Sequence, residues 1–141
     1  MTPTPAARLR HLTSASAITA TAHLTAILLD LVHRSIFQWP PSSSLVAAIG
    51  DSDLWLLGHA VAAAWIAIGF LRHHPRTLSG AHIASVAVLV PWSVCGFWWA
   101  SASIDPVSML GPALALLLGV QSLVLSRAWD SMGDARRRQE G

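Results

Sequence analysis

The sequence is poor in the residues on which soluble, disulfide-stabilised proteins depend. It has one cysteine, no lysine and no tyrosine, and charged residues make up only 11% of its 141 positions. The single cysteine, Cys95, excludes an internal disulfide, a CxxC redox pair and a zinc site built from cysteines, and we interpret it as a small apolar side chain in a helix. So few charges also argue against a soluble domain of this length.

Sequence motifs of common enzymes are missing as well. The chain contains no Ser-x-x-Lys pair, no HExxH, no glycine-rich phosphate loop and no paired carboxylates on one predicted helix. We therefore expect no catalytic activity, no metal site and no bound cofactor. The arginines cluster at the ends of apolar segments, so membrane orientation explains them without a nucleic-acid partner.

What the sequence does contain is apolar and arranged in long stretches. Hydrophobic residues make up 53% of the chain, and the mean hydropathy is +0.52. Each of four stretches has about 18 to 22 residues, which matches a hydrocarbon core of about 30 Å at 1.5 Å per residue. The first stretch is long and holds His23 and Asp30, so we interpret it as an uncleaved span and not as a secretory signal.

These stretches predict an all-α integral membrane protein, a four-helix bundle in one transmembrane unit. We expect a short disordered arm before the bundle and a polar, basic tail after it. The predicted boundaries are 1–12 for the arm, 13–128 for the bundle, 13–34, 54–71, 80–101 and 107–126 for its spans, with Ser79 capping the third, and 129–141 for the tail.

The arginines predict the orientation of the bundle. With four spans, eight of the nine arginines fall on one side and only Arg34 falls on the other. Basic loops remain on the cytoplasmic side, so we expect both termini to be cytoplasmic and the protein to lie in the cytoplasmic (inner) membrane. Arginines at this surface would meet anionic lipid headgroups, and those we expect there are Arg72, Arg76, Arg136, Arg137 and Arg138.

The first span carries a polar stripe. At 100° per residue, His23, Asp30 and His33 fall within about a third of its circumference. Such residues cost a few kcal/mol each when they face lipid, so the stripe must face other helices or water. Counted from the outer end, Asp30 is about 6 Å deep and His59 about 7 to 8 Å. We expect them to pair, either as a structural clip between helices or as a proton-holding site, within an intramembrane polar cluster of His23, Asp30, His33 and His59.

Haem ligation would need two histidines at equal depth on facing helices. His23 is expected about 8 to 9 Å deeper than His59, and His82 close to the inner surface. No pair matches on this count. Haem or quinone binding is therefore an alternative that the spacing does not favour.

Small residues mark two faces at which helices are expected to approach closely. They recur at spacings of three, four or seven, a pattern that lets neighbouring backbones come near each other in lipid. The pattern does not distinguish contacts inside the bundle from an oligomer interface. The residues are Gly58, Ala62 and Gly69 on the second span, and Gly111, Ala115, Gly119 and Ser122 on the fourth.

Three functions fit these features. The first is a non-catalytic accessory or scaffolding membrane protein that self-associates or joins a larger membrane complex. The second is a holin-like protein that permeabilises the membrane, which suits the bacterial or phage origin indicated by an all-arginine basic set. The third is a membrane-anchor subunit that handles haem, quinone or protons through His23, Asp30 and His59.

Overall fold

The computed structural model describes residues 4–36, 52–103 and 110–140, and side chains within them except at 5, 30, 33–36, 52, 99–103 and 139–140. These residues form four helices, each long and apolar enough to cross a membrane. The all-helical prediction and the number of candidate spans are thus confirmed for the described part of the chain. The helices are α1 (Pro5–Ile36), α3 (Ser52–Leu71), α4 (Pro75–Ser103) and α5 (Leu110–Glu140).

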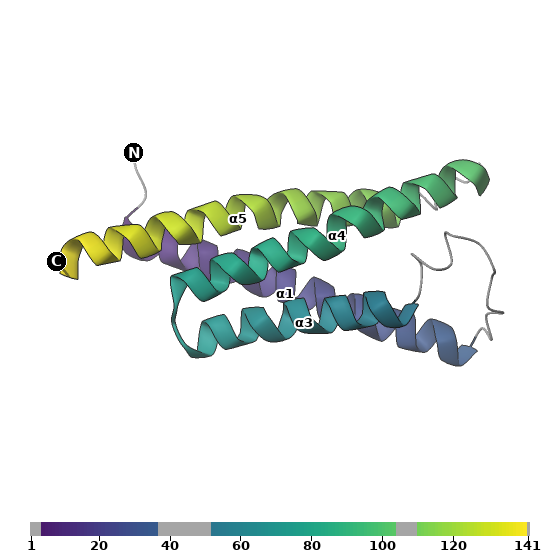
Figure 1. Cartoon of the computed structure of the whole chain (residues 1–141), viewed down its shortest axis with the longest axis horizontal. Helices are drawn as coiled ribbons and strands as arrows, with labels where there is room; N and C mark the ends of the chain where they lie inside the picture. Colours follow the sequence, from purple (N-terminus) through teal and green to yellow (C-terminus); the bar gives the residue numbers. More distant parts are fainter. Residues whose placement is uncertain (1–3, 37–51, 104–109, 141) are drawn as a thin grey trace.

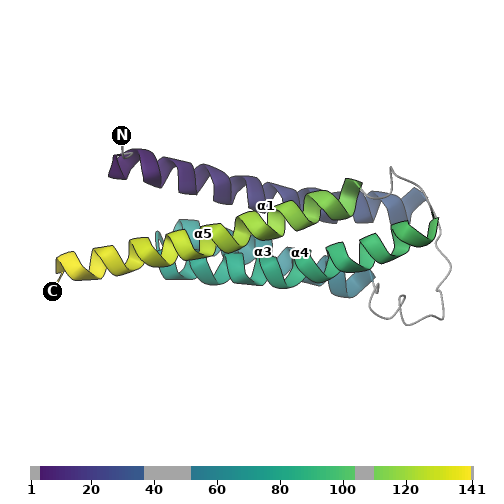
Figure 2. The same cartoon turned by 90° about the horizontal axis from the view of Figure 1, so that it is seen from above.

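The helices run alternately up and down, so that both ends of the chain and the turn between α3 and α4 lie at the same end (Figure 1). Contacts are most extensive between α4 and α5, less so between α3 and α4 and between α1 and α3, and sparse between α1 and α5. Seen from above, α1 diverges from α5 towards the chain termini (Figure 2). The arginines at this end are Arg8, Arg10, Arg72, Arg76, Arg127, Arg136, Arg137 and Arg138.

Two helices extend beyond the predicted spans. The expectation of a disordered N-terminal arm is wrong from Pro5 onward, because α1 begins there. Proline suits the first helical turn, and the Ala7 backbone N–H donates to Thr4 Oγ1 at 3.3 Å. At the other end α5 continues through the predicted tail to Glu140. Leu12 and Trp129 are both buried in the core of the bundle, so these extensions have tertiary support.

The start of α4 differs from the prediction that Ser79 caps it. The helix begins at Pro75, and His74 serves as its cap by accepting the Thr77 backbone N–H at Nδ1, at 3.3 Å. Ser79 lies in the second turn, is buried, and is 3.1 Å from Ser126 on α5, Oγ to Oγ. Ser79 was expected to cap the helix, but its hydroxyl contacts α5 instead.

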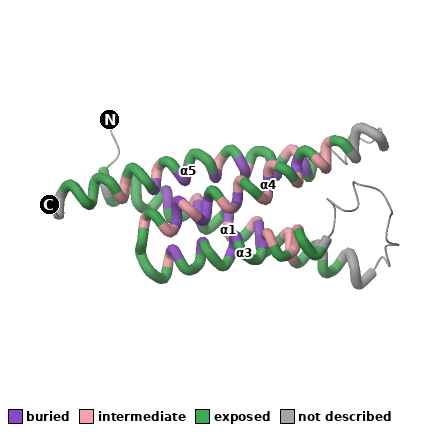
Figure 3. The backbone as a smooth tube through the Cα atoms, viewed as in Figure 1, coloured by how far each residue is buried: buried purple, intermediate pink, exposed green. Residues whose placement is uncertain are grey.

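Side-chain polarity is inverted relative to a soluble bundle. Large apolar residues such as Leu28, Leu117 and Val124 lie on the outside, whereas the fully buried side chains include His23, His82, one threonine and several serines. Figure 3 shows the buried positions along the inward faces of the helices and exposed ones around them. Together with four helices of span length, this distribution indicates a multi-pass membrane protein.

The small residues of α3 pack against α4. A Cβ added at Gly58 would lie 3.0 Å from Val88 Cγ2, and one at Gly69 would lie 2.7 Å from Leu78 Cγ. Ala62, between these glycines, is completely buried. This face therefore lies against a helix of the same chain.

The small residues of α5 approach α4 from its other side. A Cβ at Gly119 would be 3.0 Å from Val90 Cγ2, and Ala115 and Ser122 are buried. At Gly111 the added Cβ would meet only Trp92, at 3.8 Å. Gly58, Gly69 and Gly119 thus make close contacts inside the bundle, whereas Gly111 does not.

Candidate functional site

Two of the predicted polar residues meet in the centre of the bundle. His23 of α1 and His59 of α3 are both buried, and their Nδ1 atoms are 2.7 Å apart. The two rings are tilted, with centroids 5.0 Å apart. On its other side His23 places Nε2 2.9 Å from Ser85 Oγ of α4. One imidazole therefore connects three helices.

The partners of Ser85 fix the direction of these hydrogen bonds. Ser85 Oγ donates its proton to the Ala81 carbonyl at 3.1 Å, so it accepts from His23 Nε2–H. A neutral His23 protonated at Nε2 has a lone pair at Nδ1, which accepts from His59 Nδ1–H. Donation thus runs in one direction, from His59 through His23 and Ser85 to a backbone carbonyl.

A second buried network joins α1, α4 and α5. The Trp129 indole N–H donates to Ser16 Oγ at 3.0 Å, and Ser16 Oγ is 2.7 Å from His82 Nε2. His82 is completely buried, and within the described part of the chain its Nδ1 has no hydrogen-bond partner. Between them, the two networks tie all four helices together.

The depth expected for His23 is wrong. Counting from the span ends placed it about 8 to 9 Å deeper than His59, yet the two rings are in hydrogen-bond contact. The count assumed that every helix starts at a membrane surface. With 32 residues, α1 is about 48 Å long at 1.5 Å per residue and exceeds the hydrocarbon thickness, so its ends do not set its register.

The remaining members of the predicted polar cluster are Asp30 and His33. Both belong to α1, but their side chains lie outside the described residues, so the pairing of Asp30 with His59 stays a prediction.

The geometry of the histidine pair does not suit two ligands of one metal. Two imidazole nitrogens on opposite sides of a metal ion would be roughly 4 Å apart, twice the usual metal–nitrogen distance. The Nδ1 atoms of His23 and His59 are at hydrogen-bond distance instead. Among the described side chains, no three His, Cys, Asp or Glu residues are grouped to hold a metal ion.

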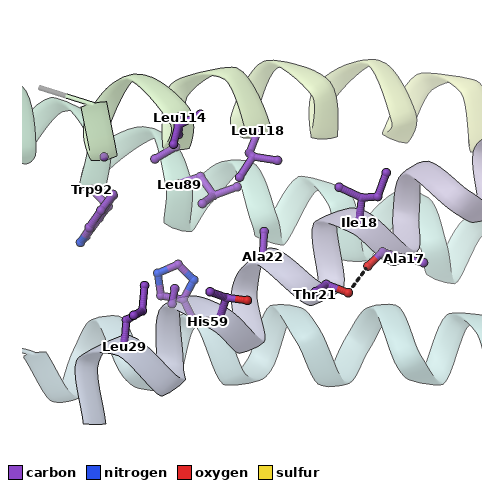
Figure 4. Close-up of a pocket in the computed structure, with 14 residues that line it drawn as sticks. Ala17, Ile18, Thr21, Ala22, Leu29, His59, Leu89, Trp92, Leu114 and Leu118 are labelled. Atoms are coloured by element: carbon purple, nitrogen blue, oxygen red, sulfur yellow. Dashed lines mark hydrogen bonds between the residues drawn. The ribbon is translucent and has the colours of Figure 1, made fainter. Parts of the chain in front are cut away.

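An apolar groove, which the sequence analysis did not identify, opens beside this network. Its volume is about 570 Å³, and it lies between α1 and α5, where these helices make few contacts, with α4 behind them (Figure 4). His59 and Trp92 border it, and the Thr21 hydroxyl is turned to the Ala17 carbonyl of its own helix, at 2.9 Å. The α1 wall is mostly small: Ala17, Thr21, Ala22, Thr25 and Ala26.

One signal for the groove was present in the sequence. Ala17, Ala22 and Ala26 of α1 recur at spacings of five and four, and Thr21 and Thr25 at four, but we did not interpret these residues as a helix-packing face. The groove itself depends on how α1 lies relative to α5, which leaves this face open opposite Gly111, Leu114 and Leu118.

The predicted surface arginines also gather around a cavity. A space of about 360 Å³ is bordered by Arg72 of the turn between α3 and α4, by Arg76 at the start of α4, and by Arg136 and Arg137 near the end of α5. Arg138 is exposed at the same end of the molecule.

Comparisons with protein-family models, with curated proteins and with solved structures found no match for this chain.

Proposed function

We propose that this protein is a non-catalytic accessory subunit of a membrane assembly, and that the groove between α1 and α5 receives a transmembrane helix of its partner. The observation that carries the proposal is the groove itself. It is an apolar hollow on the side of a bundle in which Gly58, Gly69 and Gly119 already lie against α4.

The dimensions and lining of the groove favour a helix as its occupant. Its α1 wall runs from Ala17 to Leu29, about 18 Å at 1.5 Å per residue, which accommodates three helical turns. Helices in lipid associate through close van der Waals contact at small side chains, because hydrocarbon provides no hydrophobic drive for their association. Ala22 and Ala26 on one wall and Gly111 and Ala115 on the other provide such side chains.

A non-catalytic role is favoured by the way the buried polar groups are used. His23 and Ser85 each bond to neighbours on both sides, and Ser16 links Trp129 to His82. These contacts hold helices together, as expected of polar groups that would be costly in contact with lipid. They need no turnover to explain them.

The holin-like alternative loses its main argument. It required small-residue faces that are available for assembly into a lesion, whereas the face of α3 and Gly119 of α5 lie against α4 of the same chain, and only Gly111 and Ala115 border the groove. We therefore keep it only as an outcome of the test below.

The test is photo-crosslinking from the groove in living cells. A photoreactive residue at Ala22 should capture one discrete partner, a second copy or another subunit, whereas the same residue at the exposed, lipid-facing Ala64 of α3 should not. Ala22→Phe should then reduce co-purification of that partner about tenfold or more, and Ala64→Phe should leave it unchanged, because only the first fills the groove.

Two results would contradict the proposal. If a photoreactive residue at Ala22 crosslinked to lipid alone, no partner helix would occupy the groove. Abrupt growth arrest with loss of the membrane potential on expression would favour the holin-like alternative instead.

A further inference from the structure

Two segments about sixty residues apart in sequence meet at the end of the bundle that holds the chain termini. The turn between α3 and α4 lies beside the last part of α5 (Figure 1). At their closest approach, a Cβ added at Gly133 would be 3.5 Å from Pro75 Cβ and 3.8 Å from Arg76 Cγ. The space of about 360 Å³ between them is what we call the basic pocket, lined by Arg72, His73, His74, Arg76, Arg136 and Arg137.

The backbone of the turn is held by defined contacts. His73 has a φ of 48°, in the left-handed region, and its N–H donates to the Phe70 carbonyl at 3.1 Å. The His74 N–H donates to the Gly69 carbonyl at 3.3 Å, while the His74 ring caps α4. Arg72 is therefore presented from a fixed turn and Arg76 from the first turn of α4, and neither comes from a long loop.

The pocket has an excess of positive charge. Four arginines line it, none of the described residues that line it is acidic, and Arg137 forms an ion pair with Asp134 on the same helix. The N-terminus of α4 opens at the same place and adds partial positive charge. Guanidinium groups bind phosphate oxygens through paired N–H donors, so a phosphate group is the anion that fits this lining best.

The position of the pocket indicates where the phosphate comes from. Arg72 follows directly after the apolar helix α3, whose last residue, Leu71, is 81% exposed. A phosphate held at Arg72 would thus place any attached acyl chain along the apolar outer surface of α3. A soluble anion would gain nothing from that surface.

We propose that the basic pocket is a binding site for the phosphate headgroup of an anionic phospholipid in the leaflet at this end of the bundle. The site is independent of the groove between α1 and α5, since the two cavities share no residue. Bound lipid would bridge the α3–α4 turn and the end of α5.

The experiment is native mass spectrometry of the purified full chain with phosphatidylglycerol, and with phosphatidylcholine as the probe that has the same phosphodiester but no net charge. Arg72→Gln and Arg136→Gln should each weaken phosphatidylglycerol binding about fivefold, as expected for a basic residue at a membrane surface. Arg10→Gln and Arg127→Gln remove the same charge at the same end but outside the pocket, and they should leave binding unchanged. Thermal unfolding of each variant in detergent shows whether weaker lipid binding comes from loss of the site or from loss of the fold.

Three outcomes would overturn the proposal. Equal losses in pocket and control variants would mean general electrostatic attraction to the surface, and equal binding of phosphatidylcholine would mean that headgroup charge is irrelevant. The third is competition by glycerol 3-phosphate at the concentration at which the lipid binds, which would assign the site to a soluble phosphate.

Discussion

In this bundle, hydroxyl and imidazole groups hold the helices together, a role that apolar side chains have in a soluble bundle. Apolar side chains on the outer surface, such as Leu28 and Leu117, gain nothing by moving inward from lipid. Ser16 illustrates the alternative: one hydroxyl on α1 contacts both Trp129 of α5 and His82 of α4. The specificity of helix pairing therefore rests on a few polar atoms.

Ser16→Ala should destabilise the bundle, because it leaves two buried groups, the Trp129 N–H and His82 Nε2, without their shared partner. We expect a loss of about 1 to 2 kcal/mol in the free energy of unfolding in detergent, the range for a lost buried hydrogen bond. Ser122→Ala is the matched control. Ser122 is equally buried, but within the described part of the chain its hydroxyl has no partner, so removing it should change stability by less than about 0.5 kcal/mol. Equal effects of the two substitutions would contradict the assigned contacts.

The histidine pair predicts non-additive effects. His23→Leu and His59→Leu should each destabilise the protein by leaving the other imidazole unpartnered at Nδ1, whereas the double variant removes both polar groups together. The double variant should be less destabilised than the sum of the single ones by about 0.5 kcal/mol or more. Thermal unfolding of the four proteins in one detergent measures this, and additive values would show that the rings do not interact.

At the scale of elements, α4 is the helix around which the others are arranged. The small-residue face of α3 lies against Leu78 and Val88, and that of α5 lies against Val90. Ser85 and His82 of α4 also connect it to α1 through hydrogen bonds. Contacts of α4 thus account for most of the close packing in the bundle.

Gly119→Leu should destabilise the monomer, since even a Cβ there would lie 3.0 Å from Val90 Cγ2. Overpacking of this kind costs about 1 to 3 kcal/mol. Gly111→Leu on the same helix is the control, because its Cβ would approach Trp92 no closer than 3.8 Å. Unfolding in detergent should separate the two variants. An unchanged stability combined with a shift from oligomer to monomer in light scattering would instead place Gly119 at an interface between copies.

For the whole molecule, the features that the sequence predicted well depend on composition. The features that it predicted poorly depend on how the helices are placed along one another. Span count follows from apolar length, and the second span, expected at 54–71, is α3 at Ser52–Leu71. The gathering of arginines at one end follows from counting spans. The contact between His23 and His59 could not be predicted, because α1 is longer than a membrane is thick and is free to slide along its neighbours. The groove also depends on how α1 is placed relative to α5, which no local pattern fixes.

The topology proposal is that both chain ends face the cytoplasm, with the connection between α1 and α3 on the other side. It can be tested in a Cys95→Ala background, which removes the native thiol, half-buried in α4. Single cysteines are placed at Ala135, exposed near the end of α5, and at Ser43, in the connection between α1 and α3. Since eight of nine arginines share the end that carries Ala135, we expect an impermeant thiol reagent added to intact cells to label the Ser43→Cys variant only, and both variants after the cells are opened. Labelling of both variants in intact cells would contradict the odd number of spans, α3, α4 and α5, that the proposal places between Ser43 and Ala135. Labelling of Ala135→Cys alone would keep four spans but invert the orientation, and it would move the basic pocket to the outer leaflet.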